Sequence, residues 1–205
     1  MKIAVIGAGS VGSTLGGAWQ RRGHDVTYGV PNPADGKYAS LGGAARANAD
    51  AARDADVVAL CTPWPATEAA IQACGNLADK VVIDCTNPLT TDASALVIGH
   101  DTSGAERVAK WAVGARVCKA MNQIGAPMMD APPLPSTPVM FVCGDDDDAK
   151  QTTTRLVSEL GFEAVDAGDL TVARLLEPLA LLWIHLALRR SFGTNWGFGL
   201  LRAGT

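Results

Sequence analysis

The chain starts with Met1-Lys2-Ile3-Ala4-Val5-Ile6-Gly7-Ala8-Gly9-Ser10-Val11-Gly12, an apolar run that passes directly into the pattern Gly-x-Gly-x-x-Gly. A segment of helical character, 13–22, follows and ends at Gly23. In this order of strand, glycine turn and helix, Gly7 permits the tight turn, Gly9 lets the backbone approach a ligand, and Gly12 allows the helix to pack on the strand. The free N–H groups and the positive dipole end of the helix attract phosphates. The stretch therefore predicts a dinucleotide pyrophosphate site.

The composition is that of a globular chain of 205 residues, with 48% hydrophobic and 19% charged residues and a formal net charge of −4. No basic patch stands out, which argues against a nucleic-acid partner. The five cysteines have no metal-binding spacing and fit free thiols in a reducing cytoplasm, so no metal site and no disulfide is predicted. The first strand begins at the N-terminus and the apolar run 178–188 is too short for a bilayer, so we expect a cytoplasmic protein without a signal peptide or membrane association.

Apolar strand segments alternate with helical segments along the chain. Strands are predicted at 25–28, 56–61, 80–85, 116–120, 139–143 and 162–165, and helices at 49–53, 66–74, 106–113, 145–160 and 170–190. The early strands are apolar throughout, which is typical of parallel strands covered on both faces. The sequence predicts a doubly wound α/β fold, with a Rossmann dinucleotide-binding domain over 1–168 and a small C-terminal helical extension over 169–205.

The loop after the second strand selects the dinucleotide. NAD enzymes place an acidic residue there and NADP enzymes an Arg, whereas this chain has Val30, Pro31 and Asn32. Asn32 can donate its amide to a hydroxyl or a phosphate. Lys37 is the nearest cation, with an ordinary solvated surface lysine as the alternative interpretation. We expect a mild preference for NADP(H), and NAD(H) stays possible.

Two further strand ends lie on the predicted ligand path, because ligands in this architecture bind beyond the carboxyl ends of the strands. The residues concerned are Cys61, Thr62, Pro63 and Trp64 after one strand, and Thr86, Asn87 and Pro88 after the next. We expect them along the ribose and the nicotinamide, with plain loop chemistry as the alternative.

No catalytic triad can be inferred. The histidines are scattered, and His185 is expected to be a hydrogen-bonded core residue. Lys119, Met121 and Asn122 end a strand near the expected nicotinamide. Met121 and Asn122 are predicted to bind the cofactor. A Lys and Asn pair there could serve an imine or hydroxyacid reductase, but we favour the interpretation that Lys119 points away from the cleft. No catalytic side chain is therefore predicted.

With these residues in place, the chain resembles the F420-dependent NADP oxidoreductase family from Met1 to about Arg202. Besides the opening glycines, the resemblance rests on the segments 62–64, 142–147, 165–168 and 173–177. It implies hydride transfer between NADP(H) and the deazaflavin coenzyme F420 as co-substrate. It also implies a C-terminal helical extension that helps to form the coenzyme cleft.

The resemblance carries roles to individual residues. Ala8, Ser10 and Val11 would hold the pyrophosphate. Asn122 and Ile124 would lie close to the reacting ring, and Trp196 and Phe198 would complete the deazaflavin pocket. The chain departs from the family after the second strand, where Val30 and Pro31 stand in place of the usual Arg.

The predicted helix 170–190 is apolar on nearly all sides in its second half. Such a helix must be covered by its own domain, a ligand or a second subunit, and we expect a homodimer with this helix in or near the interface. Two other functions stay open: an NAD(P)H-dependent reductase of an imine, carbonyl or metal acceptor, and a non-catalytic dinucleotide sensor.

Overall fold

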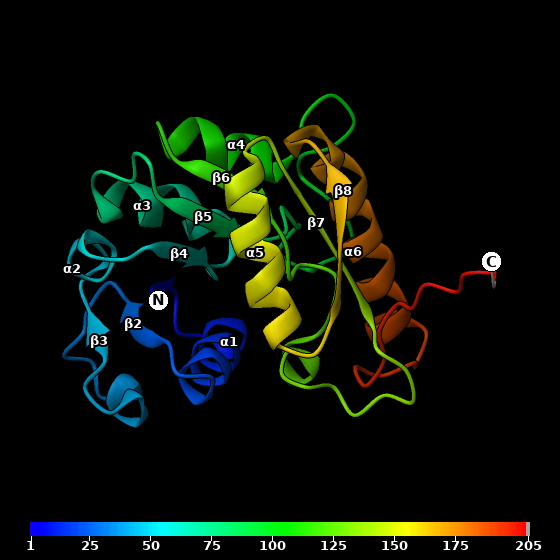
Figure 1. Cartoon of the computed structure of the whole chain (residues 1–205), viewed down its shortest axis with the longest axis horizontal. Helices are drawn as coiled ribbons and strands as arrows, with labels where there is room; N and C mark the ends of the chain where they lie inside the picture. The colour runs from blue at the N-terminus through cyan, green and yellow to red at the C-terminus, as the bar shows by residue number, and fades with distance from the viewer. Residues whose placement is uncertain (204–205) are drawn as a thin grey trace.

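The computed structural model describes residues 1–203, and its centre is one eight-stranded sheet (Figure 1). The strands are β1 (Lys2–Ile6), β2 (Asp25–Gly29), β3 (Ala45–Arg46), β4 (Val57–Leu60), β5 (Val81–Asp84), β6 (Arg116–Lys119), β7 (Val139–Gly144) and β8 (Glu163–Gly168). Their order in the sheet is β3-β2-β1-β4-β5-β6-β7-β8. Neighbours are parallel except β6 and β7. The first six strands have the Rossmann order, which confirms the predicted doubly wound α/β fold.

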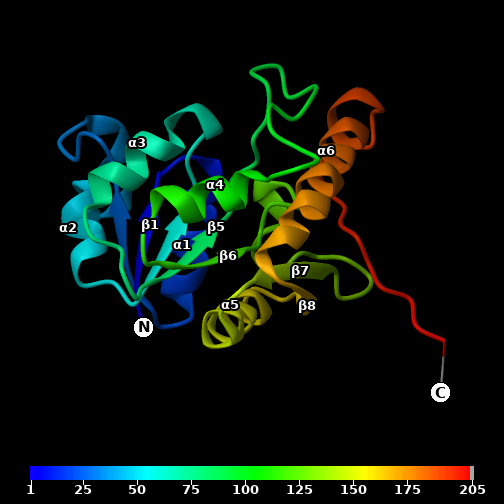
Figure 2. The ribbon, with the colours of Figure 1, turned by 90° about the horizontal axis from the view of Figure 1, so that it is seen from above.

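Helices cover both faces of this sheet. They are α1 (Ser10–Arg21), α2 (Asn48–Arg53), α3 (Trp64–Cys74), α4 (Gly104–Trp111), α5 (Asp147–Glu159) and α6 (Ala173–Arg189), with short 3-10 turns at Gly36–Leu41, Ala126–Met128 and Leu170–Val172. The core residues of α1 and α5 pack on one face of the sheet, and those of α2, α3, α4 and the start of α6 pack on the other. Figure 2 shows the sheet between these two layers.

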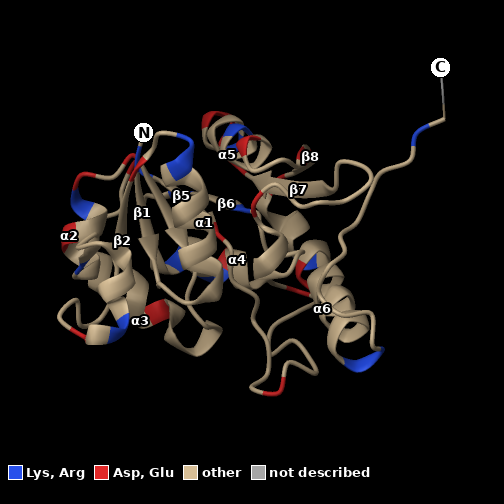
Figure 3. Ribbon diagram, turned by 90° about the horizontal axis from the view of Figure 1, so that it is seen from below, with Lys and Arg blue, Asp and Glu red and all other residues tan. Residues whose placement is uncertain are grey.

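Strand β1 shows why these strands are apolar throughout. Ile3 and Val5 join the core on the α1 and α5 side, whereas Ala4 and Ile6 join the core on the opposite side. All four side chains are buried. Because helices cover both faces, a central parallel strand has no solvent-facing side and therefore no polar alternation. In Figure 3 the charged residues lie mainly on the helices and loops around the sheet.

The structure differs from the sequence-based elements in several details. Helix α1 begins at Ser10, inside the glycine pattern, because Gly9 is already its N-cap. Strand β3 is two residues long, too short for a hydrophobic period to reveal it. Strand β7 runs antiparallel to β6, since the long connection that contains Ala126–Met128 returns the chain without a crossover helix.

The last helix departs from its expected form in two ways. It starts as a 3-10 turn, and α6 proper begins at Ala173. The prediction that His185 is a core residue is wrong, because its side chain is exposed. By length and composition alone the stretch Leu170–Arg189 would suffice to cross a membrane, and 39% of an 18-residue stretch within it is buried in the fold. Residues 204 and 205, the end of the predicted extension, lie outside the described residues.

Candidate functional site

A cavity of about 1040 Å³ lies beyond the carboxyl ends of β1, β2, β4 and β5. Doubly wound folds bind their ligands at this position. The volume of the cavity is at the upper end of the usual range for small-molecule and cofactor sites. The sequence-predicted residues that line it are Gly7, Ala8, Gly9, Ser10, Val11, Val30, Cys61, Thr62, Pro63, Trp64, Thr86 and Asn87. The fold thus brings most of the predicted cofactor residues to one cavity.

The three glycines of the turn have different surroundings. Gly7 has φ +98°, and a Cβ there would lie 2.8 Å from the carbonyl oxygen of Cys61. A Cβ at Gly12 would lie 1.9 Å from the carbonyl oxygen of Gly7, so these two positions require glycine for the turn itself. A Cβ at Gly9 would meet no atom within 4 Å. Gly9 is therefore free of any packing demand in the described chain, and its open space is the cradle that a pyrophosphate would fill.

Helix α1 presents its N-terminus to this space. Gly9 is its N-cap, and no side chain caps the helix. The first N–H groups of a helix have no partner within it, and they carry the positive end of the dipole. An anion bound above Ser10 and Val11 would therefore satisfy donors that the chain itself does not.

The opposite end of the cavity, beyond β2 and α2, is lined by Pro31, Tyr38, Ala47, Asn48 and Ala49 in addition to Val30. Two residues that were predicted for this end of the cavity, Asn32 and Lys37, do not line it. Asn32 accepts a hydrogen bond from the backbone N–H of Ala34 at 3.3 Å. The ammonium of Lys37 lies 2.9 Å from a carboxylate oxygen of Asp35 and stacks over the ring of Tyr38. Asn32 and Lys37 therefore serve local turn contacts in the structure.

The third part of the cavity is formed by the ends of β4 and β5. The hydroxyl groups of Thr62 and Thr67 are 2.9 Å apart, which ties the loop after β4 to the first turn of α3. The thiol of Cys85 is buried beside Cys61. A hydrogen bond with Cys61 and the burial hold the pKa of Cys85 well above that of a free thiol, so Cys85 stays protonated. Pro88 does not line the cavity, and its carbonyl accepts the N–H of Val97.

A pair of amides stands behind this wall. The Asn87 side chain donates to the carbonyl oxygen of Asn122 at 2.9 Å, and the Asn122 side chain donates back to the Asn87 side chain at 3.0 Å and to the carbonyl oxygen of Leu176 at 3.2 Å. Met121, which is wholly buried, has φ +60°. This left-handed turn at a non-glycine residue is strained and directs Asn122 toward Asn87. Met121 and Asn122 thus lie one layer behind the cavity wall.

An ion network that the sequence analysis missed supports the same wall. The ammonium of Lys119 lies 2.8 Å from Asp84, 3.0 Å from Glu177 and 2.6 Å from the carbonyl oxygen of Thr86. Burial opposes the charge on Lys119, but the two carboxylates outweigh it and raise its pKa to about 12. Lys119 is completely buried and does not line the cavity, in line with the expectation that it points away from the cleft. Asp84 and Lys119 pair in register at the ends of β5 and β6. The sequence signal that could have revealed the network is that two neighbouring apolar strands end in opposite charges.

Ile124, Trp196 and Phe198 come together at another place. The indole of Trp196 stacks on Trp183 with centroids 5.4 Å apart, and Phe198 packs edge-on against Trp196. Ile124 lies where a Cβ on Gly197 would touch it at 3.3 Å. None of the three lines the large cavity. They cover the C-terminal half of α6 at Trp183, and the carbonyl oxygen of Phe198 accepts the N–H of Val139 at the start of β7.

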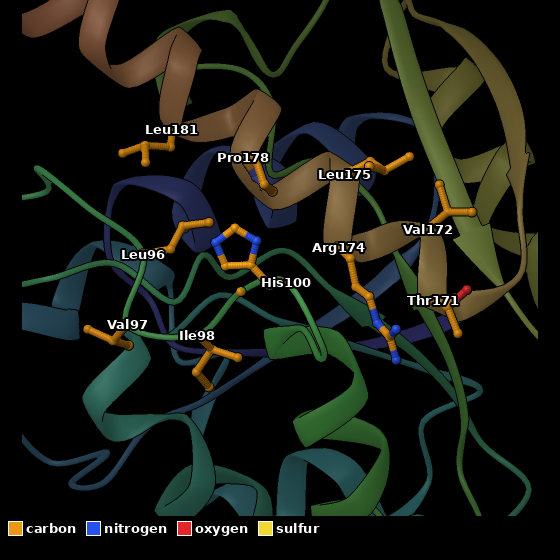
Figure 4. A pocket seen from close by; sticks show the side chains of 11 residues that line it. Leu96, Val97, Ile98, His100, Thr171, Val172, Arg174, Leu175, Pro178 and Leu181 are labelled. Atoms are coloured by element: carbon orange, nitrogen blue, oxygen red, sulfur yellow. The ribbon is translucent and has the colours of Figure 1, made fainter.

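A second hollow, of about 740 Å³, lies between the loop 96–100 and the first half of α6. Figure 4 shows the imidazole of His100 between Leu96 and Pro178. The guanidinium of Arg174 at its rim forms two hydrogen bonds with the carboxylate of Glu106. The lining is otherwise mostly apolar.

The chemistry available in the large cavity is limited. All of its lining residues lie within the described range, and none of them is an Asp, Glu, His, Lys or Arg. The wall offers hydroxyls, amides, thiols and backbone groups. The cavity therefore lacks the side chains for a reaction that needs a strong acid or base from the chain. It suits a reaction that needs a redox cofactor bound in a fixed position.

Comparisons with known proteins show which family the chain resembles. A family profile described as coenzyme F420-dependent NADP oxidoreductase matches residues 2–88. The F420-dependent NADP reductase of Methanocaldococcus jannaschii is 30% identical over 155 residues, which is 72% of this chain and 70% of that protein. A crystal structure from Arthrobacter sp. FB24, assigned to the F420-dependent NADP reductases, is 31% identical with a TM-score of 0.89 and covers 98% of this chain and 100% of its own.

Similarity also extends to a metalloreductase. Metalloreductase STEAP3 of Rattus norvegicus is 28% identical over 88% of this chain, and the chain spans 37% of the length of that protein. The similarity to the two NADP reductases covers most or all of both partners. The chain belongs to the F420-dependent NADP oxidoreductase family.

Proposed function

We propose that this protein transfers a hydride between NADP(H) and a planar acceptor, with the deazaflavin coenzyme F420 as the first choice. The observation that carries the proposal is the large cavity, which joins a glycine turn to the ends of β4 and β5 without any acidic, basic or imidazole side chain in its lining. Hydride transfer between two stacked rings depends on position and on exclusion of water more than on an acid supplied by the protein. Reduction of a simple carbonyl would need a proton donor close to the oxygen.

The residues of the chain would act by binding and positioning. The turn Gly7 to Gly12 and the N-terminus of α1 would hold the pyrophosphate. Thr62, Pro63 and Trp64, which follow β4, would lie along the ribose and nicotinamide. Thr86 and Asn87, which follow the neighbouring strand β5, would lie beside them. The nicotinamide supplies the hydride when it is bound, and the protein holds this end rigid through the Asn87 and Asn122 amides.

Support for NADP(H) comes from the family and not from the loop after β2. The relatives are named for NADP reduction, whereas Val30 and Pro31 offer no cation to a 2′-phosphate. Asn32 and Lys37 stay candidates for that contact by sequence, although the structure engages both in local contacts.

Assay of the purified protein with NADPH and F420 tests the proposal. We expect NADPH oxidation in step with loss of the absorbance of oxidised F420. The other reductase class predicts NADPH oxidation with an imine, a carbonyl or a ferric chelate, and no oxidation with F420. A sensor predicts saturable NADPH binding with no turnover of any acceptor. Either of these results would contradict F420 as the acceptor.

We also infer a homodimer that acts in the cytoplasm, with residues 169–205 as the extension. Support for the dimer lies on α6, whose exposed face carries Leu175, Pro178 and Leu182 at helical spacing. The second hollow continues this apolar surface beside the first half of α6. A monomer that leaves an apolar patch of this kind in water is unusual. Support for a reducing compartment is that all five cysteines are free.

A further inference from the structure

The segment 30–53 encloses the end of the cavity beyond β2 and α2, is described throughout, and contains three cations, Lys37, Arg46 and Arg53. Two of them are neutralised by neighbours. Lys37 lies 2.9 Å from a carboxylate oxygen of Asp35, and Arg53 pairs with Asp50. Arg46 forms no salt bridge within the described residues. It is therefore the cation of this segment that keeps its charge available.

The guanidinium of Arg46 is exposed and only partly engaged. Its Nη1 atom donates to the carbonyl oxygens of Gly43 and Ala45, the latter at 2.7 Å. Within the described chain, Nε and Nη2 have no hydrogen-bond partner. These two atoms form one edge of the planar group, and such an edge can donate two parallel hydrogen bonds to the oxygens of one phosphate.

The place of Arg46 follows from the short strand β3. Arg46 pairs in register with Gly29, and the N–H of Val30 donates to the carbonyl oxygen of Arg46 at 2.9 Å. Gly29 and Val30 line the cavity on one side of Arg46, and Ala47 and Asn48 line it on the other. The backbone of Arg46 is therefore set beside the cavity at the end of β2, next to lining residues, although Arg46 itself is not part of the lining. In this fold the end of β2 is where the 2′ position of the adenosine ribose is recognised.

We propose that Arg46 recognises the 2′-phosphate of NADP(H), in place of the Arg that the loop after β2 lacks. Arg46 belongs to β3, the strand next to β2. Its cation would therefore reach the phosphate from beside the loop that follows β2. This assignment rests on the proposed binding of NADP(H). It concerns discrimination between the two dinucleotides and no step of the hydride transfer.

Calorimetric titration of the whole protein with NADPH and with NADH tests the assignment. In Arg46→Ala and Arg46→Gln we expect NADPH affinity to fall about tenfold or more, because hydrogen bonds to a charged group are lost. NADH affinity should stay within about twofold of the wild-type value, because NADH has no 2′-phosphate and loses no hydrogen bond in these variants. Arg53→Ala, which removes the same charge from a paired site on α2, is the matched control and should bind both dinucleotides as the wild type does.

The other outcomes are distinct. An equal loss of NADPH and NADH affinity in both Arg46 variants would show that Arg46 only shapes its loop, and would overturn the assignment. Unchanged NADPH affinity there, with a loss in Lys37→Ala, would also overturn it and would give the phosphate to Lys37. A wild type that binds neither dinucleotide would contradict the proposed function itself, and this assignment with it.

Discussion

The ammonium of Lys119 lies 3.0 Å from a carboxylate oxygen of Glu177, which joins the central sheet to the first half of α6. The exposures of Lys119, Asp84 and Glu177 are 0%, 0% and 1%. The carboxylate of Glu177 also accepts the N–H groups of Gly104 and Ala105 at the start of α4. The second negative charge of the network is thus held by the N-terminus of a helix, where the dipole favours it.

Removal of the cation from this network should be strongly destabilising. We expect Lys119→Met to lower the free energy of unfolding by about 3–5 kcal/mol, because two buried carboxylates are left facing each other without their partner. Urea unfolding measures this loss. In Lys119→Met with Glu177→Gln part of the loss should be recovered, since one uncompensated charge is gone. Equal stability of the single and double variants would argue against coupling of the two groups.

The same network predicts a loss of stability in alkali. The pKa of Lys119 in the folded protein is raised to about 12, whereas the pKa of a lysine in the unfolded chain is about 10.4. Its contribution is therefore fully present below about pH 10.4 and is lost as the pH rises toward 12. Thermal unfolding across this range should show a fall in the wild type beyond the fall in Lys119→Met. Parallel curves for the two proteins would contradict the prediction.

The amide pair behind the cavity should matter for the reaction more than for the binding of the dinucleotide. In Asn87→Ala the amide of Asn122 keeps its bond to Leu176 but loses its bond to Asn87, and the wall at the ends of β5 and β6 is fixed less firmly. We expect the turnover number to fall about tenfold, the effect of one lost hydrogen bond in a positioned site. The dissociation constant for NADPH should change less, because its pyrophosphate contacts are intact. Calorimetry with steady-state kinetics separates the two effects.

The proposed homodimer can be tested directly on α6. Leu182 is 49% exposed in the middle of the apolar face. We expect Leu182→Glu to convert a dimer into a monomer in sedimentation experiments, because a charge buried in an apolar interface is costly. Val113→Glu is the matched control, since Val113 is 78% exposed and follows α4. A monomeric wild type at micromolar concentration would contradict the dimer.

Much of the fold could be predicted from the sequence, for a physical reason. Buried parallel strands such as β1 are apolar throughout, and the glycine pattern with its strand and helix is a local signal. Strand β3 could not be found, because two residues carry no period and the pairing of Arg46 with Gly29 arises only in the folded sheet. The network of Lys119 and Glu177 joins residues 58 positions apart, counted from their numbers, and no local pattern contains it. The reading of His185 failed because hydrophobic neighbours do not show which side of a helix is covered.

The most direct test of the central claim is the affinity of Gly9→Val for NADPH. The structure has no atom within 4 Å of a Cβ at Gly9, so the variant should fold and melt as the wild type does. Its side chain would occupy the space assigned to the pyrophosphate, and we expect NADPH affinity to fall by about a hundredfold or more, as for loss of several charge-assisted hydrogen bonds. A folded Gly9→Val protein that binds NADPH with wild-type affinity would show that the dinucleotide does not bind at the glycine turn.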